Sequence, residues 1–235
     1  MNDNLVKLKY PEDFVNKIIN ADCFDILPII PDCSVDLVIT DPPYGVIGNM
    51  CDWDKIDVYD FTSKWWNIVK EKMKDNSSAY IFWSQKYLFE GLNLFRPNRT
   101  LIWHHPNLAK TTNKMFLWTY DPIFYIKKGN PTFTAHFCNK ENVDVFVYSK
   151  PQNNWKGDNK RFHPTSKPPK LIQNFIKISS CEKDIILDPF LGGGTTAIAC
   201  KRLNRNFITI EKDTNYYNIS LERFKNETFN DLYEE

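Results

Sequence analysis

The sequence predicts an α/β domain with a mostly parallel sheet, and three observations lead to that prediction. Short apolar runs of strand length alternate with segments whose apolar residues recur at helical spacing. A glycine-rich turn joins one such strand to a helical pattern late in the chain. An acid followed by two prolines stands directly after another strand-like run. A chain of 235 residues is long enough to bury one ordinary core, so we expect one domain.

Each element has its own signal along the chain. Runs rich in Ile, Val and Leu indicate strands, whereas Phe61, Trp65, Ile68 and Met73 recur at helical spacing. Clusters of proline, glycine and polar residues mark the loops. In order, the predicted strands are 17–20, 36–40, 78–83, 99–104, 123–127, 184–188 and 207–211. The predicted helices are 24–30, 61–74, 86–95, 170–179 and a segment from Ala197, and 45–59, 106–117 and 131–162 are predicted to be loops or irregular.

The tetrapeptide Asp41-Pro42-Pro43-Tyr44 follows the run at 35–39, where open α/β sheets place their ligands. Its two prolines fix φ and remove two amide donors, which keeps the turn extended. An exocyclic amine could donate one hydrogen to the Asp41 carboxylate and the other to a backbone carbonyl, while Tyr44 offers a ring for a base to stack on. The alternative interpretation is an ordinary proline turn with a surface tyrosine.

A second cluster is the glycine turn at 190–196. Gly192, Gly194 and Ala197 satisfy the G-x-G-x-x-A pattern, in which small residues let the backbone approach a bound nucleoside. The next strand ends in Glu211, about twenty residues after Gly192, a spacing typical of an acid that accepts ribose hydroxyls. The turn lacks the Gly-Lys-Ser/Thr ending of a phosphate-binding P-loop. A flexible surface turn is the alternative.

Together the two clusters resemble S-adenosylmethionine-dependent amino-methyltransferases of DNA, specifically the beta class of bacterial restriction-modification systems and their solitary relatives. In that class the catalytic tetrapeptide precedes the glycine turn, as it does here. The segment 163–168, His-Pro-Thr-Ser-Lys-Pro, is similar to the family's His-Pro-Thr-x-Lys-Pro motif, which flanks the methionine end of the cofactor. The segment 20–36 is similar to the strand and acid near the cofactor adenine, and 120–129 to a late strand.

The resemblance implies a fold, a cofactor and a set of site residues. The implied fold is a Rossmann-like S-adenosylmethionine-dependent methyltransferase fold, circularly permuted, with a mostly parallel seven-stranded sheet whose last strand is antiparallel. One domain would span 1–235, with target-recognition insertions at about 45–57 and 106–162. The cofactor would be S-adenosyl-L-methionine. The implied catalytic residues are Asp41, Pro42, Pro43 and Tyr44. The implied cofactor-binding residues are Asp22, Cys23, Asp41, Lys167, Asp188, Pro189, Phe190, Gly192, Gly193, Gly194, Thr195 and Glu211.

The implied activity is methyl transfer to adenine N6 of a flipped-out base in DNA, because family members with Asp first in the tetrapeptide mostly modify adenine. Cytosine N4 is the alternative within the same chemistry. No Pro-Cys dipeptide is present to attack a pyrimidine ring, so transfer should be direct. A non-catalytic DNA-recognition module would be expected to lack Asp41, Tyr44 or the glycines, and none is lost. The order of motifs argues against a protein-glutamine or RNA methyltransferase.

Composition and charge agree with a DNA partner. The net charge is only +1, but the stretch 104–170 holds ten Lys and one Arg against four acids, interleaved with aromatic residues. Such a stretch suits phosphate contact and base stacking, and a solvated lysine face is the alternative. Double-stranded DNA is the expected partner, and a homodimer, a partner subunit or a cognate restriction endonuclease stays open. We expect a cytoplasmic protein without a membrane segment, six reduced and mostly buried cysteines, and no metal.

Overall fold

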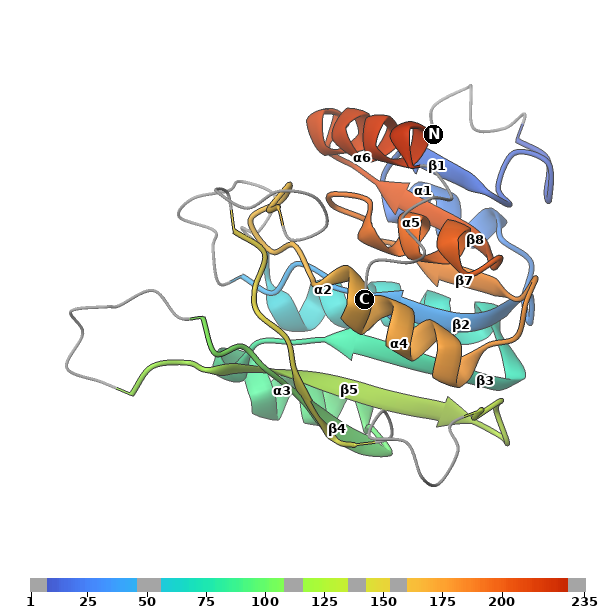
Figure 1. Cartoon of the computed structure of the whole chain (residues 1–235). Helices are drawn as coiled ribbons and strands as arrows, with labels where there is room; N and C mark the ends of the chain where they lie inside the picture. Colours follow the sequence, from blue (N-terminus) through green and yellow to red (C-terminus); the bar gives the residue numbers. More distant parts are fainter. Residues whose placement is uncertain (1–7, 46–55, 108–115, 135–142, 153–159, 228–235) are drawn as a thin grey trace.

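An eight-stranded sheet lies at the centre of the computed structural model, which describes residues 8–45, 56–107, 116–134, 143–152 and 160–227 (Figure 1). The strand order is β1-β8-β7-β2-β3-β5-β4-β6. The strands are β1 (Lys17–Asn20), β2 (Val35–Thr40), β3 (Met73–Phe82), β4 (Arg99–His104), β5 (Tyr120–Lys128), β6 (Val145–Val147), β7 (Ile185–Asp188) and β8 (Asn206–Glu211).

Strand direction divides the sheet into two parts. From β1 to β3 all neighbouring strands are parallel. The strand β5 then runs antiparallel to both β3 and β4, and its arrow opposes that of β3 in Figure 1. The last strands of the chain, β7 and β8, lie between β1 and β2. The predicted circular permutation and mostly parallel sheet are therefore confirmed.

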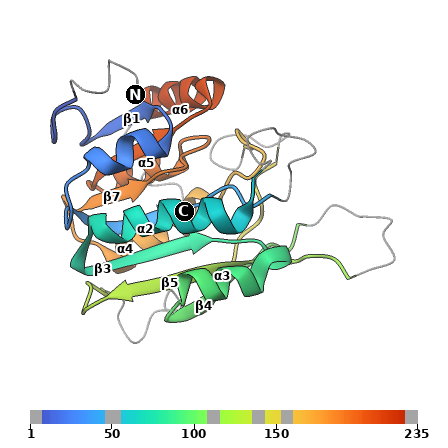
Figure 2. The same cartoon turned by 180° about the vertical axis from the view of Figure 1, so that it is seen from behind.

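Helices cover both faces of the sheet. One face carries α1 (Cys23–Ile26), the 3-10 turns η2 (Leu27–Ile29) and η4 (Gln85–Tyr87), α2 (Val58–Lys72) and α3 (Leu88–Phe95) (Figure 2). The other face carries α4 (Pro169–Ser179), α5 (Thr195–Arg202) and α6 (Thr214–Asn226), which lie in front in Figure 1. Among the described helices, none is long and apolar enough to cross a membrane.

This two-sided cover explains the apolar run of β2. Side chains alternate across a strand, so Val38 joins the core beneath α1, α2 and α3, whereas Leu37 and Ile39 join the core beneath α4 and α5. The irregularity between Val35 and Leu37 lets Val35 join the same core as Val38. A strand buried on both faces reads as a continuous apolar run rather than as an alternating one. Asp36 is the polar exception within the strand, which ends at the buried Thr40, directly before Asp41.

The structure corrects several sequence predictions. The sheet has eight strands, not seven, because β6 lies inside the stretch 131–162 that was predicted to be irregular. A three-residue strand is too short to show an alternating pattern. The helix α2 begins at Val58, inside the predicted loop 45–59, because Asp57 caps it by accepting from the Asp60 amide. The strand β3 begins at Met73, where a helix was predicted, and α6 was not predicted at all.

The cysteines also differ from expectation. Cys23 and Cys200 are buried as predicted, but Cys33 and Cys181 are exposed, and Cys51 and Cys138 lie outside the described residues. Both exposed cysteines stand in short turns that precede strands, where the chain runs over the surface.

Candidate active site

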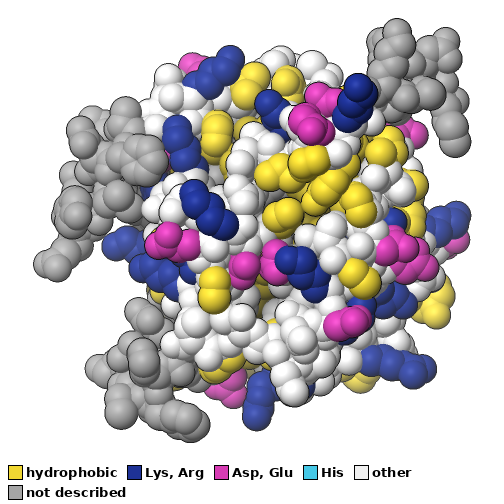
Figure 3. Space-filling model, turned by 90° about the vertical axis from the view of Figure 1, so that its right-hand side faces the viewer, with side chains coloured by type: hydrophobic (Ala, Val, Ile, Leu, Met, Phe, Trp, Pro, Cys, Tyr) yellow, Lys and Arg dark blue, Asp and Glu magenta, His cyan; other side chains and the backbone are white. Residues whose placement is uncertain are grey.

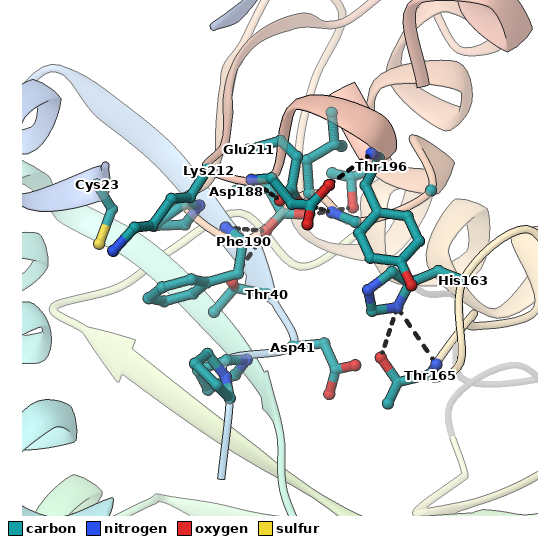
Figure 4. A pocket seen from close by; sticks show the side chains of 18 of the residues that line it. Cys23, Thr40, Asp41, His163, Thr165, Asp188, Phe190, Thr196, Glu211 and Lys212 are labelled. Atoms are coloured by element: carbon teal, nitrogen blue, oxygen red, sulfur yellow. Dashed lines mark hydrogen bonds between the residues drawn. The ribbon is translucent and has the colours of Figure 1, made fainter. Parts of the chain in front are cut away.

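A cavity of about 620 Å³ opens at the carboxyl ends of β2, β7 and β8 (Figure 4). This is the edge of an open α/β sheet at which ligands bind. The tetrapeptide Asp41 to Tyr44 forms one wall, and the turn after β7 forms another. The segment 163–167 and the residues that follow β8 complete the lining. Four separate segments of the sequence are thus brought to one site.

Asp188, the last residue of β7, is 3% exposed and organises this edge. Its Oδ1 accepts from the hydroxyl of Thr40 (2.8 Å) and the amide of Phe190 (3.1 Å), and its Oδ2 accepts from the hydroxyl of Thr196 (2.6 Å) (Figure 4). Burial raises the pKa of Asp188 to about 6, although these three donors favour the ionised form. The carboxylate therefore ties the end of β2 to the glycine turn and to α5.

The glycine turn has two different functions along its length. Gly192 (φ 57°) and Gly193 line the cavity, and a Cβ on Gly192 would lie 3.4 Å from the ring of His163. Gly194 (φ 92°) was predicted to face the nucleoside, but it does not line the cavity, and a Cβ there would lie 3.0 Å from the Cβ of Ser220 in α6. Arg223, also in α6, donates to the carbonyl of Gly193. The helix α6 thus supports the turn from behind.

Glu211 ends β8 and turns its carboxylate back to the glycine turn. Its Oε2 accepts from the amide of Gly192 (2.7 Å), and its Oε1 accepts from the amide of Asp213 (2.8 Å). Burial outweighs these two bonds and raises the pKa of Glu211 to about 7. Each oxygen keeps a second lone pair, so the carboxylate can still accept from hydroxyl groups of a ligand.

Asp22 and Cys23 line the cavity near Lys212. Asp22 caps α1 by accepting from the amide of Phe24 (3.0 Å), and its other oxygen pairs with Lys212 (2.8 Å). Burial acts to raise the pKa of Asp22, but the bonds from Lys212 and Phe24 lower it below its usual value. Burial raises the pKa of the Cys23 thiol, which is therefore neutral.

Asp41 pairs with Lys167 across the cavity. Its side chain is 14% exposed, and in the described part of the chain its buried Oδ1 has no hydrogen-bond partner. Burial raises the pKa of Asp41, although the facing Lys167 ammonium opposes that shift. Lys167 also donates to the carbonyl of Thr165 (3.0 Å) and lies over the ring of Phe82 (5.1 Å). One carboxylate oxygen of Asp41 is thus paired with an ammonium group, and the other can accept a hydrogen bond from a ligand.

Aromatic rings form the walls around these polar groups. Tyr44 lies edge-on to Trp83, with the ring centroids 5.9 Å apart. Phe190 packs between Phe61 (5.8 Å) and Trp65 (5.4 Å). On the opposite wall, His163 lies 4.2 Å from the ring of Tyr216, and burial together with the Lys167 charge lowers the pKa of His163 to about 4.

The structure brings nearly all predicted site residues to this one cavity. Asp22, Cys23, Asp41, Pro42, Pro43, Tyr44, Lys167, Asp188, Pro189, Phe190, Gly192, Gly193, Thr195 and Glu211 line it, and Gly194 does not. Sequence reasoning missed Thr40, Phe61, Thr196, Lys212 and Tyr216, which line it as well. Lys212 and the two threonines adjoin recognised motifs, whereas Phe61 and Tyr216 reach the cavity from helices and have no local signal.

Comparison with known proteins gives concordant matches. A DNA methylase family profile matches residues 35–222. The type II methyltransferase M2.DpnII of Streptococcus pneumoniae is 31% identical, over 89% of this chain and 90% of the relative. M.HinfI of Haemophilus influenzae is 30% identical, over 91% of this chain and 69% of the relative. The crystal structure of the M1.HpyAVI–SAM complex has a TM-score of 0.70 at 26% identity, covering 88% of this chain and 98% of that one.

The fold, the cavity and these matches define an S-adenosylmethionine-dependent methyltransferase of DNA. The profile covers most of the chain, and M2.DpnII aligns with it over 90% of its own length. The chain belongs to the DNA methylase family of N6 and N4 amino-methyltransferases, whose relatives here are type II methyltransferases of restriction-modification systems.

Proposed function

We propose that the enzyme methylates adenine N6 of a base flipped out of duplex DNA, with Asp41 as the acceptor for the target amine. The observation that carries the proposal is the buried Oδ1 of Asp41, which has no hydrogen-bond partner in the described part of the chain. A buried acceptor without a donor is costly unless a ligand supplies one. The adjoining Pro42, Pro43 and Tyr44 line the same cavity.

The cavity residues fit S-adenosyl-L-methionine. Glu211, with a free lone pair on each oxygen, would accept the ribose hydroxyls. Gly192 and Gly193 let the backbone approach the nucleoside, Asp22 and Cys23 would lie near its adenine, and Lys167 would lie near its methionine end. Pro189, Phe190 and Thr195 complete the proposed set, and Asp188 acts by holding the turn. We assign Gly194 to packing on α6 rather than to the cofactor.

When bound, S-adenosylmethionine supplies an electrophilic methyl group, so the protein needs mainly to align and sharpen a weak nucleophile. Asp41 accepts one hydrogen of the amine and the Pro42 carbonyl accepts the other, which draws the nitrogen toward tetrahedral geometry and aims its lone pair. The proton becomes acidic as the new bond forms, and it leaves to Asp41 or to water. Tyr44 offers its ring to the flipped base, which recovers part of the cost of unstacking, a few kcal/mol.

Adenine is favoured over cytosine because Asp stands first in the tetrapeptide. The solved cytosine-N4-specific PvuII methyltransferase has a TM-score of 0.73 with this chain, but at 17% identity that likeness shows the fold alone. The choice of base therefore rests on Asp41.

DNA recognition is proposed for the segments at about 45–57 and 106–162 within a single domain of 1–235, because both lie between the tetrapeptide and the glycine turn in the sequence and 106–162 carries much of the basic charge. The face turned to the viewer in Figure 3, opposite the cavity edge, carries Lys and Arg beside Asp and Glu, so it offers no continuous basic surface to DNA. A homodimer, a partner subunit and a cognate restriction endonuclease are consistent with the family. A cytoplasmic location follows from a DNA substrate.

Base and recognition site can be tested together by expressing the chain in cells that lack DNA methylation and sequencing their DNA with detection of modified bases. We expect N6-methyladenine within one short sequence, and none in cells that express the Asp41→Ala variant. N4-methylcytosine would overturn the assignment of the base. Unmodified DNA from a folded protein that binds S-adenosylhomocysteine would favour a non-catalytic recognition module.

A further inference from the structure

A second carboxylate lies close to the catalytic pair and is not explained by the tetrapeptide. Asp121 stands at the start of the antiparallel strand β5, at the same edge of the sheet as Asp41. Its Oδ2 pairs with Lys150 (3.0 Å), and its Oδ1 faces Nε2 of the buried His105 (3.8 Å). Among the described residues, neither ring nitrogen of His105 has a hydrogen-bond partner. The group is therefore a partly buried cluster in which His105 is buried and the Lys150 side chain reaches solvent.

Both lysines lie near the same indole ring, that of Trp103. Lys150 lies 5.4 Å and Lys167 lies 5.9 Å from the ring centroid of Trp103. Trp103 and Asp121 are cross-strand partners in the β4–β5 register, so their side chains share one face of the sheet. His105 lies on that face too, with its ring 5.4 Å from Trp103. Asp121 therefore pairs with Lys150 and lies near enough to Lys167 to feel its charge.

Charge couples this cluster to the catalytic carboxylate. Burial acts to raise the pKa of Asp121, but His105, Lys150 and Lys167 outweigh it and lower that pKa to about 2. The negative charge of Asp121 in turn raises the pKa of Asp41. Asp41 also faces Lys167 and Thr165, and its charge acts on Asp188. Lys167 is thus attracted by two carboxylates, of which only Asp41 belongs to the tetrapeptide.

We propose that Asp121 is a positioning residue that shares the Lys167 ammonium with Asp41, and that Lys150 sets the balance by neutralising Asp121. This inference rests on the proposed function of Asp41. If Lys167 paired with Asp41 alone, its ammonium would reduce the negative charge that the free Oδ1 of Asp41 offers to the target amine. Attraction toward Asp121 weakens that effect, and Lys150 keeps Asp121 from drawing Lys167 away completely.

The test is the pH dependence of kcat/KM for methyl transfer from tritiated S-adenosylmethionine to unmethylated phage DNA. Asp121→Asn removes a charge that repels the ionised Asp41. The acid limb of the kcat/KM profile, which Asp41 sets, should move to lower pH by about half a unit, and the plateau value of kcat/KM should fall. Lys150→Met leaves Asp121 unneutralised, so the limb should move to higher pH. The double variant should return toward the parent limb.

Asp36→Asn is the matched control. Asp36 pairs with Lys74 at 2.7 Å, with side-chain exposures of 17% and 43% against 20% and 42% for Asp121 and Lys150. It stands near the start of β2, at the far end of the strand from Asp41, so its loss should leave the limb unmoved. A role for Lys150 in DNA binding alone would lower kcat/KM at every pH without a shift. Unshifted limbs in both variants, or a parent profile without an acid limb, would overturn the inference. Retained transfer in Asp41→Ala would instead overturn the proposed function.

Discussion

Two carboxylates stand at the ends of neighbouring parallel strands, and their surroundings differ. Asp188, at the end of β7, accepts three hydrogen bonds, from two threonine hydroxyls and one amide. Asp41, directly after β2, has one oxygen paired with Lys167 and a buried second oxygen without a partner in the described part of the chain. Both carboxylates line the same cavity.

The difference in hydrogen bonding assigns a structural role to Asp188 and a chemical role to Asp41, although both lie at the same edge of the sheet. A buried carboxylate whose acceptor positions are filled by fixed donors holds segments together. A buried carboxylate with an unfilled position can accept a new donor without first breaking a bond, and this is what a reacting amine requires. Asp188 is therefore expected to act through stability and Asp41 through turnover.

The largest expected effect is on turnover in Asp41→Ala. Losing the acceptor for the amine should lower the rate of methyl transfer by about 10²–10⁴-fold. The free energy of unfolding should fall less than in Asp188→Ala, because Oδ1 of Asp41 has no donor to lose and Lys167 keeps its bond to the carbonyl of Thr165. Single-turnover assays and urea unfolding would measure the two effects. A variant that turns over normally would contradict the contrast with Asp188.

The converse variant is Asp188→Ala, which leaves the hydroxyls of Thr40 and Thr196 and the amide of Phe190 without their acceptor. The free energy of unfolding should fall by about 2–4 kcal/mol, since breaking a buried hydrogen-bonded network is among the more destabilising changes. Affinity for S-adenosylhomocysteine should fall as well, because the glycine turn loses its tie to β2. Urea unfolding would contradict this account if stability matched that of the parent.

Tyr44 belongs to the catalytic side of the comparison, and its ring rather than its hydroxyl is invoked. Tyr44→Ala should slow methyl transfer by about 10–100-fold, corresponding to the 1–3 kcal/mol that base stacking contributes. Tyr44→Phe should retain most of the rate and is the matched control. Equal losses in the two variants would assign the effect to the hydroxyl.

Glu211 combines the properties of Asp188 and Asp41. Each of its oxygens accepts a hydrogen bond from a backbone amide and keeps a second lone pair for a ligand. Its pKa of about 7 means that it is half protonated near neutral pH. Ribose hydroxyls favour the ionised form, so affinity for S-adenosylhomocysteine should weaken by up to about tenfold per unit as the pH falls below 7. Glu211→Gln should bind more weakly and lose this dependence, as calorimetry at several pH values would show.

The raised pKa of Glu211 has the opposite pH dependence when the property measured is the stability of the ligand-free protein. The pKa of Glu211 is raised above its ordinary value of 4.5, so the folded state binds the proton more tightly than the unfolded chain does. The resulting contribution to stability is present below pH 4.5 and is lost as the pH rises through about 7. The free energy of unfolding of Glu211→Gln should lack that decline.

Sequence patterns were sufficient for the parallel part of the sheet and for most of the cavity. The strands β2, β7 and β8 are mostly buried, so their runs are mainly apolar, and Asp41, Asp188 and Glu211 stand where those runs end. Patterns failed where tertiary contacts decide the structure. The edge strand β6 pairs with β4 over only three residues, and Gly194 serves α6 rather than the cavity. Nothing local in the sequence shows that Ser220 lies against it.

The smallest expected effect concerns the basic surface near the cavity mouth. Lys160 and Arg161 are exposed, and Lys160 lies 5.3 Å from the ring of Phe162, next to the segment that carries His163. If both contact phosphates, replacing them with Gln should reduce the slope of log affinity against log salt by about 0.9 for each contact. Because phosphate contacts position DNA without reading its sequence, affinity for all duplexes should weaken alike and site preference should persist.

The control is Lys64→Gln with Lys70→Gln on α2, which removes the same charge from the opposite face of the sheet and should leave the slope unchanged. Fluorescence anisotropy at several salt concentrations would decide the matter, and equal slopes for the two double variants would show that the 160–161 segment does not contact DNA.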